Sequence, residues 1–273
     1  MTRLVLGPAA HAAGTTADWV AEIGSTSTEA RERLRSGLSG PLWIVTDRQT
    51  GGRGRRGRAW TAPVGNLAAS LGLRLAVPPA MAATFGFVAS LAARDGVLAA
   101  AGDAGLPPPA QLSLSRGLRV KWPNDVLLDG AKLSGILLEA EPGPDGTLDL
   151  VVGIGINVVA APEGLPYRAA SLAGLGLHAR AVFRGLADEM AGLVALWDNG
   201  RGFAAVRQRW LEAAAGLGRP VSVVIGASVR EGIFRTIDAD GRLILEGPDG
   251  GTQAIAAGEV HFGAARTGTA TEG

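Results

Sequence analysis

The sequence predicts an α+β protein with a mixed central sheet flanked by helices, followed by a small C-terminal β-barrel. Apolar runs of strand length alternate with amphipathic helical segments as far as residue 215. From Arg219 onward, short strands separated by glycine turns replace the helices. A chain of 273 residues with 47% apolar residues can fold as one large and one small domain. We predict a large domain at 1–217, a small domain at 218–263 and a disordered tail at 264–273.

Local sequence patterns predict the helices, strands and turns of both domains. In the first helix, Thr26 and Glu29 have the spacing of a capping box, and Gly37 is a plausible C-terminal stop. Hairpin turns are predicted at Asp129-Gly130 and at 142–146. The large domain has predicted strands at 19–24, 42–47, 66–75, 118–128, 131–141 and 148–159, and predicted helices at 25–38, 82–101, 179–197 and 201–215. The small domain has predicted strands at 219–226, 230–238, 241–247 and 252–262.

Composition excludes several classes of protein. The formal net charge of +1 argues against a protein built mainly to coat nucleic acid. The chain has no cysteine and only three histidines, which excludes disulfides and thiolate sites and disfavours a histidine-rich metal centre. The first residues lack the apolar core of a signal peptide. The longest uncharged apolar run, 76–93, is rich in alanine and is typical of a buried helix, so we expect no membrane partner. We also expect no DNA partner, and we expect the protein to be cytoplasmic.

Lysine is used in only one place. Of the 26 basic residues only Lys121 and Lys132 are lysines, and they lie in one short window. Arginine and lysine are interchangeable on most solvated surfaces, whereas a lysine supplies a compact and mobile point charge. Chance survival is the alternative, but the distribution favours a functional role for this window.

A glycine-arginine segment, "TGGRGRRGRAW" at 50–60, precedes this window. Its glycines allow backbone amides to approach a ligand closely, and its arginines supply forked donors for carboxylate or phosphate oxygens. It is not a Walker loop, because no Gly-Lys-Ser/Thr follows. An RNA-binding tract and a merely solvated loop are the alternatives. Its position between two predicted core strands favours the anion-binding interpretation.

Two further clusters carry polar groups and glycines. In "VKWPNDVLLDGAKLSG" (120–135), a proline turn presents Asn124 and Asp125, and a hairpin returns Lys132 to the neighbouring strand. A surface ion pair of little consequence between Asp125 and Lys132 is the alternative. In "GIGIN" (153–157), Gly153 and Gly155 lack side chains on the same strand face, which clears a groove.

Four segments together resemble the biotin protein ligases. "STSTEA", "QTGGRGRRGRAW", "KWPNDVLLDGAKLSGILLE" and "VVGIGINV" occur in the order and approximate spacing of that family, and the resemblance covers roughly residues 19–262. It implies a class II synthetase or biotin-lipoate ligase-like fold with an SH3-like C-terminal domain. Fewer than about twenty residues precede the first predicted strand, which is too short for a winged-helix domain. We therefore expect the monofunctional form, without the N-terminal repressor domain.

The resemblance implies a two-step reaction. Biotin and ATP, with Mg²⁺, would give biotinyl-5′-AMP, and a lysine of a biotin carboxyl carrier domain of acetyl-CoA carboxylase or a related carboxylase would then accept the biotin. The family often pairs catalytic domains edge to edge, so a homodimer is possible. The glycine-arginine loop is expected to fold over the water-sensitive intermediate. Lipoate or octanoate ligation, biotin binding without catalysis, and RNA binding are the alternatives.

The resemblance also assigns residues to roles, and it leaves the metal ligands unknown. The expected catalytic residues are Lys132, Arg55 and Asp125. The expected biotin-binding residues are Ser25, Thr26, Gln49, Arg53, Gly54, Arg55, Lys132, Gly135, Gly153 and Gly155. The expected ATP-binding residues are Arg53, Arg55, Arg58, Trp60, Lys121, Asn124, Lys132 and Asn157, with Trp60 stacking on adenine.

Overall fold

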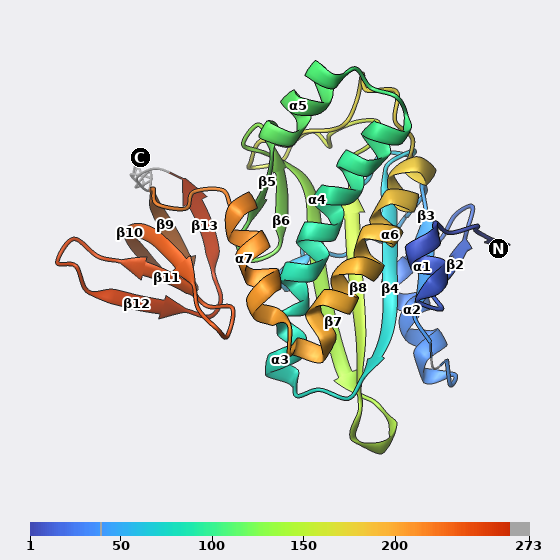
Figure 1. Ribbon diagram of the computed structural model, residues 1–273, viewed down its shortest axis with the longest axis horizontal. Helices are drawn as coiled ribbons and strands as arrows, with labels where there is room; N and C mark the ends of the chain where they lie inside the picture. Colours follow the sequence, from blue (N-terminus) through green and yellow to red (C-terminus); the bar gives the residue numbers. More distant parts are fainter. Residues whose placement is uncertain (39, 263–273) are drawn as a thin grey trace, which may run out of the picture.

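A computed structural model describes residues 1–38 and 40–262, so the tail predicted at 264–273 lies outside the described residues. Its larger part is built on an eight-stranded sheet with the order β1-β2-β3-β4-β8-β7-β6-β5 (Figure 1). The strands are β1 (Thr2–Arg3), β2 (Thr16–Trp19), β3 (Leu42–Thr46), β4 (Leu67–Leu75), β5 (Leu118–Lys121), β6 (Asp125–Leu128), β7 (Ala131–Pro142) and β8 (Leu148–Ile156). β2 and β3 are parallel and the other neighbours are antiparallel, so the predicted mixed sheet is confirmed.

Helices cover both faces of this sheet (Figure 1). They are α1 (Pro8–Ala12), α2 (Thr26–Arg35), α3 (Pro79–Ala83), α4 (Phe85–Asp103), α5 (Pro108–Gly117), α6 (Ala179–Trp197) and α7 (Phe203–Ala213), with 3₁₀ turns at Arg55–Gly57, Pro144–Gly146 and Asp198–Gly200. In β3, Trp43 and Val45 join the main core beneath α4 and α6. Leu42 and Ile44 face the opposite way and pack with Leu34 of α2. This two-sided burial explains why β3 reads as an unbroken apolar run.

The long apolar segment is a core helix. By length and composition, the helical stretch Pro79–Asp103 is sufficient to cross a membrane, but 72% of its most apolar window is buried inside the protein. In α4, Phe85, Val88 and Ala92 are fully covered by the sheet and by neighbouring helices. The predicted buried helix is therefore confirmed.

Two local predictions near the start of the chain were wrong. The strand predicted at 19–24 ends at Trp19, and beyond it only Ile23 makes an isolated bridge, to Gln49. The N-cap of α2 is Ser25, whose Oγ accepts a hydrogen bond from the Thr28 backbone N–H at 3.3 Å. The capping-box spacing of Thr26 and Glu29 had predicted Thr26 as the N-cap, which is one residue too late. The prediction failed because several consecutive residues in this segment are good N-caps.

Other differences concern segments in which a turn interrupts an apolar run. The strand predicted at 118–128 is the hairpin of β5 and β6, in which Lys121 pairs with Asp125 across the turn. Pro123 lies in that turn, since it has no N–H to give to a ladder. Helix α5 was not predicted. It begins within a run of three prolines, with Pro107 as its N-cap and Pro108 as its first residue, and the sequence analysis did not use this run as a helix start.

The C-terminal part is a five-stranded antiparallel sheet with the order β12-β11-β10-β9-β13. Its strands are β9 (Pro220–Ile225), β10 (Ser228–Ile237), β11 (Leu243–Glu246), β12 (Thr252–Ile255) and β13 (Glu259–Phe262). The small β domain is thus confirmed, but the described residues form an open sheet in which β12 and β13 do not pair, rather than a closed barrel. The single strand predicted at 252–262 is β12 followed by β13. In Figure 1 this sheet lies beside α7, separate from the larger sheet.

Candidate active site

A cavity of about 690 Å³ lies where the larger sheet, the glycine-arginine loop and β13 meet. The predicted site residues that line it are Ser25, Thr26, Gln49, Arg53, Gly54, Arg55, Arg58, Trp60, Lys121, Asn124, Asp125, Lys132, Gly135, Gly153 and Gly155. Lys132 and the segment 50–60, which are far apart in the sequence, therefore share one cavity.

The floor of the cavity is cleared by glycines on β7 and β8. Gly135 and Gly155 are paired across the two strands. A Cβ at Gly155 would lie 2.4 Å from Cε2 of Trp60, and a Cβ at Gly135 would lie 3.0 Å from Cζ3 of the same ring. The glycines therefore make room for the Trp60 indole itself. Within the described chain the buried Nε1 of Trp60 has no hydrogen-bond partner.

One end of the cavity is a network of short neutral side chains. Gln49 Oε1 accepts from the backbone N–H of Thr26 at 2.9 Å and from its Oγ1 at 3.1 Å. The Oγ atom of Ser70 lies 2.8 Å from Thr26 Oγ1 and 3.0 Å from Ser27 Oγ. Thr26 is at the start of α2, so the helix end brings its backbone N–H to Gln49. Sequence analysis missed Ser70 and Ser27, because no motif links β4 to the helix start.

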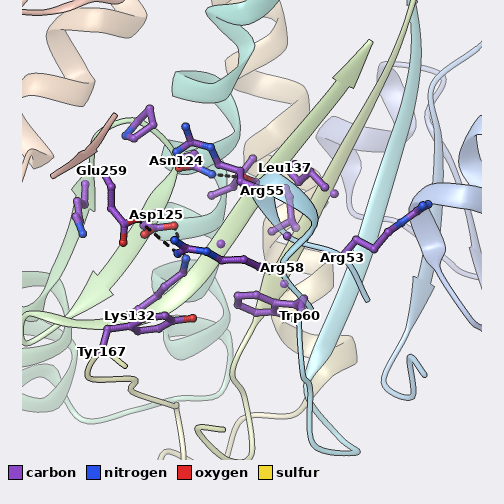
Figure 2. A pocket seen from close by; sticks show the side chains of 18 of the residues that line it. Arg53, Arg55, Arg58, Trp60, Asn124, Asp125, Lys132, Leu137, Tyr167 and Glu259 are labelled. Atoms are coloured by element: carbon purple, nitrogen blue, oxygen red, sulfur yellow. Dashed lines mark hydrogen bonds and ion pairs between the residues drawn. The ribbon is translucent and has the colours of Figure 1, made fainter. Parts of the chain in front are cut away.

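The other end of the cavity holds the two lysines. Lys132 Nζ lies 2.7 Å from Asp125 Oδ1, and it lies 5.8 Å and 5.5 Å from the ring centroids of Trp60 and Tyr167 (Figure 2). The β6–β7 hairpin produces the pairing with Asp125, because it returns Lys132 to the sheet beside the turn. Burial is the main cause that lowers the pKa of Lys121, and the nearby charge of Asp125 opposes it.

The arginines of the loop have different protein partners. Arg53 donates to Thr28 Oγ1 at 2.8 Å and points away from Lys132, toward α2 (Figure 2). Arg55 donates to Asn124 Oδ1 at 3.0 Å. Arg58 Nη1 lies 3.5 Å from Glu259 Oε2 on β13. The loop thus connects α2, the proline turn and the C-terminal sheet.

Asn157 does not line the cavity. Its side chain is 2% exposed, and its Nδ2 donates to the Ala170 carbonyl at 2.9 Å. Its backbone carbonyl accepts from the Leu172 N–H at 3.0 Å. Asn157 therefore holds the segment 170–172 against the end of β8, and the neighbouring residues Tyr167 and Arg168 line the cavity instead.

Sequence analysis missed several cavity residues. Tyr167 and Arg168 lie in an irregular segment, and Glu259 and Phe262 lie on β13. None of these residues belongs to a local pattern that identifies a site. The isolated position of Tyr167, the single tyrosine of the chain, was the one available signal.

The cavity fits a magnesium ion only as a companion of phosphate groups. The described residues contain no cluster of three or more His, Cys, Asp or Glu side chains able to hold a metal ion. The two carboxylates of the cavity lining, Asp125 and Glu259, each lie beside a cation. Because Mg²⁺ is commonly bound by one or two carboxylates together with substrate phosphates, these two residues are suitable partners for it.

Comparisons with known proteins agree with this architecture. Residues 19–157 match the model of the biotin/lipoate A/B protein ligase family, and residues 216–263 match the biotin protein ligase C terminal domain. A biotin--[acetyl-CoA-carboxylase] ligase of Paracoccus denitrificans is 41% identical over 89% of this chain and 99% of that protein. A protein of the same name from Mycobacterium tuberculosis is 36% identical over 89% of this chain and 87% of its own length.

A solved structure shares the fold. The biotin protein ligase from Aquifex aeolicus, in complex with biotin and ATP, superposes with a TM-score of 0.70 at 24% identity. The superposition covers 91% of this chain and 99% of that one. The sequence matches over both parts of the chain show that it belongs to the biotin/lipoate A/B protein ligase family and carries the C-terminal domain of the biotin protein ligases.

Proposed function

We propose that this protein is an ATP-dependent ligase that activates biotin as biotinyl-5′-AMP and transfers it to a lysine of a biotin carboxyl carrier domain of acetyl-CoA carboxylase or a related carboxylase. The observation that carries the proposal is the convergence of Lys132 and the glycine-arginine loop on one glycine-floored cavity. Relatives that share 41% and 36% identity with nearly the whole chain are named as ligases of this kind.

The first step requires two anions to approach each other. The biotin carboxylate attacks the α-phosphate of ATP, and pyrophosphate leaves. In this proposal Lys132 bridges the carboxylate and the phosphoryl oxygen, while Arg55 and Arg58 bind phosphate oxygens. Arg53 would exchange Thr28 for a ligand oxygen. Mg²⁺, when bound, would neutralise part of the charge on the phosphates, and Asp125 and Glu259 are the carboxylates of the lining that would hold it.

The second step is attack by the acceptor lysine on the mixed anhydride, which releases AMP. The incoming ammonium must lose a proton before its nitrogen can attack. Asp125 is a suitable acceptor for that proton, and it also orients Lys132 through their 2.7 Å contact.

The neutral end of the cavity suits the ureido ring of biotin. Ser25, Thr26 and Gln49 offer both donors and acceptors, which a buried ureido group needs for each of its polar atoms. The floor at Gly135, Gly153 and Gly155 would accommodate the apolar chain of biotin once the Trp60 ring has moved off Gly135 and Gly155. Trp60 would stack on the adenine, with Lys121 and Asn124 serving the nucleotide, and Asn157 would act by holding the segment that carries Tyr167.

The proposal extends to organisation and location. We assign catalysis to residues 1–217, with 218–263 as an accessory domain. A homodimer could form along β7, because within the described chain β6 pairs with β7 only as far as Gly135 and leaves 137–142 as an open edge. We place the enzyme in the cytoplasm, since the one helical stretch among the described residues that is long and apolar enough to cross a membrane belongs to the core.

Biotin-dependent exchange of labelled pyrophosphate into ATP tests the proposed function. We expect exchange with biotin, and exchange near background with lipoate or octanoate. Exchange that requires lipoate would instead indicate a lipoate-type ligase. Binding of RNA with steep salt dependence, and no exchange with any acid, would favour the RNA-binding alternative.

A further inference from the structure

The C-terminal sheet contacts the proline turn of the active site through one buried hydrogen bond. Trp122 is 2% exposed, and its indole Nε1 donates to the backbone carbonyl of Gly241 at 3.1 Å. Gly241 lies in the turn between β10 and β11, so donor and acceptor belong to the two different sheets. An indole N–H buried without a partner would be costly, and therefore this bond fixes the ring relative to the turn.

The turn that supplies this carbonyl is held by its own hydrogen bonds. Asp238 Oδ1 accepts from the backbone N–H groups of Asp240 at 2.9 Å and Arg242 at 2.8 Å. Arg242 Nε donates back to Asp238 Oδ2 at 2.7 Å. On the strand leading into the turn, Arg207 of α7 donates to the Ile237 carbonyl. The Gly241 carbonyl is thus presented by a closed and anchored turn.

Gly241 itself is seated against the larger domain. Its φ is +82°, and a Cβ there would lie 2.9 Å from Cε2 of Phe87 on α4. A residue with a side chain would therefore be strained in its backbone and would also displace the turn from the ring of Trp122.

Trp122 is continuous with the groups that surround Lys132. Two residues further along, Asn124 accepts from Arg55 at 3.0 Å, and its backbone carbonyl accepts from the Ile136 N–H at 2.9 Å. The next residue, Asp125, contacts Lys132 at 2.7 Å. A shift of the Trp122 ring would therefore move the partners of both cations.

We infer that the β10–β11 turn positions the active site, with Trp122 and Gly241 as positioning residues that fix the turn 122–125 and, through it, Arg55 and Lys132. The inference rests on the proposed function for its kinetic consequence. It gives the C-terminal sheet a role in the chemical step that requires no contact between this turn and a substrate.

The test compares two buried tryptophans, each of which donates one hydrogen bond from its indole N–H. Trp122→Phe removes one buried N–H donor at the turn. Trp210→Phe removes another, because Trp210 is also fully buried and donates to Ser90 Oγ at 3.0 Å, within the larger domain and outside the cavity lining. We expect kcat of biotin-dependent exchange to fall about tenfold or more in Trp122→Phe, with KM for biotin within about twofold of wild type. Trp210→Phe should keep its kcat within about twofold.

A second pair of variants addresses the turn. Gly241→Ala should lower kcat in the same way. Gly250→Ala should leave kcat unchanged. Gly250 lies in another turn of the same sheet and also has a positive φ, +78°, but an added Cβ there would have no atom within 4 Å. Equal kcat values for Trp122→Phe and Trp210→Phe, at comparable Tm, would overturn the inference.

Hydrogen exchange gives a readout that does not depend on activity. We expect faster amide exchange in peptides covering 122–136 for Trp122→Phe than for Trp210→Phe. If wild type shows no exchange of pyrophosphate with biotin, the proposed function fails while this measurement still decides the positioning role. Unchanged amide exchange in Trp122→Phe would contradict that role even in an active enzyme.

Discussion

The two ends of the cavity are built in different ways. At the neutral end, Thr26 lies on α2, Gln49 lies in the loop that follows β3, and Ser70 lies on β4. These uncharged side chains hydrogen-bond to one another. At the cationic end, long side chains reach in from a loop and a hairpin, and most of them contact an oxygen of another protein group, such as Asp125 for Lys132 and Glu259 for Arg58.

This difference suits the ligands that the proposed function assigns to each end. A neutral network of short side chains loses little conformational entropy when it is ordered, so it can be built in advance. Several cations in one cavity repel one another, and contacts between most of them and protein oxygens offset that repulsion. A ligand at the cationic end would therefore exchange partners with existing ion pairs, whereas a ligand at the neutral end would join an existing network.

The largest expected effect is that of Lys132→Ala. Loss of the bridging charge should lower kcat of biotin-dependent exchange about a hundredfold to a thousandfold, because the charge it stabilises develops mainly in the transition state. KM for biotin should change little, since the neutral end is intact. Steady-state exchange kinetics would check both values. Lys132→Arg should recover only part of the rate, because a guanidinium is a planar fork rather than a point charge; full activity of Lys132→Ala would show that the two ends do not divide the work in this way.

Thr26→Val should show the opposite pattern. The change keeps the side-chain shape but removes a hydroxyl that contacts both Gln49 and Ser70. We expect a loss of about 1–3 kcal/mol in biotin binding, which is about fivefold to 150-fold in KM, with kcat nearly unchanged. Thr28→Val on the same helix is the control, since its Oγ1 accepts from Arg53 instead. Titration calorimetry with biotin measures the difference, and a fall confined to kcat would contradict the comparison.

Arg55→Gly should weaken the enclosure of the intermediate. Arg55 lines the cavity and joins the loop to the proline turn through Asn124. Its removal should speed the release of biotinyl-5′-AMP about tenfold, because a charge-assisted contact is lost and the loop opens more easily. A filter-binding assay with labelled adenylate checks this value. Arg48→Gly, which removes a surface ion pair with Glu22, should leave the release rate unchanged; equal rates for wild type and Arg55→Gly would exclude an enclosing role.

The smallest effect concerns stability and pH. Burial lowers the pKa of Lys121 below its ordinary value of 10.5, so between the lowered pKa and 10.5 the unfolded chain binds more protons than the folded one. The free energy of unfolding should therefore rise with pH through that window. Lys121→Met should remove this rise and should be more stable than wild type below it. Urea denaturation from pH 7 to 10.5 measures both, and parallel pH profiles for the two proteins would contradict the assignment.

Sequence patterns predicted which residues form the site better than they predicted how those residues are arranged. All of the proposed site residues come from the four motifs, and all of them line the cavity except Asn157, whose side chain faces the 170–172 segment. Local spacing could not choose between Ser25 and Thr26 as the cap, since both have suitable hydroxyls. The adenine-stacking role expected of Trp60 gave no indication that its ring would lie on Gly135 and Gly155.

The sequence by itself determined the mixed sheet and the change to short strands in the C-terminal part, and it predicted the chemical character of the site, because periodicity, turn residues and rare lysines are local properties. Only the tertiary structure decided that β13 would form a wall of the cavity and that Gly241 would accept a hydrogen bond from Trp122. Those contacts join residues more than a hundred positions apart. They depend on how two sheets pack, which no local pattern encodes.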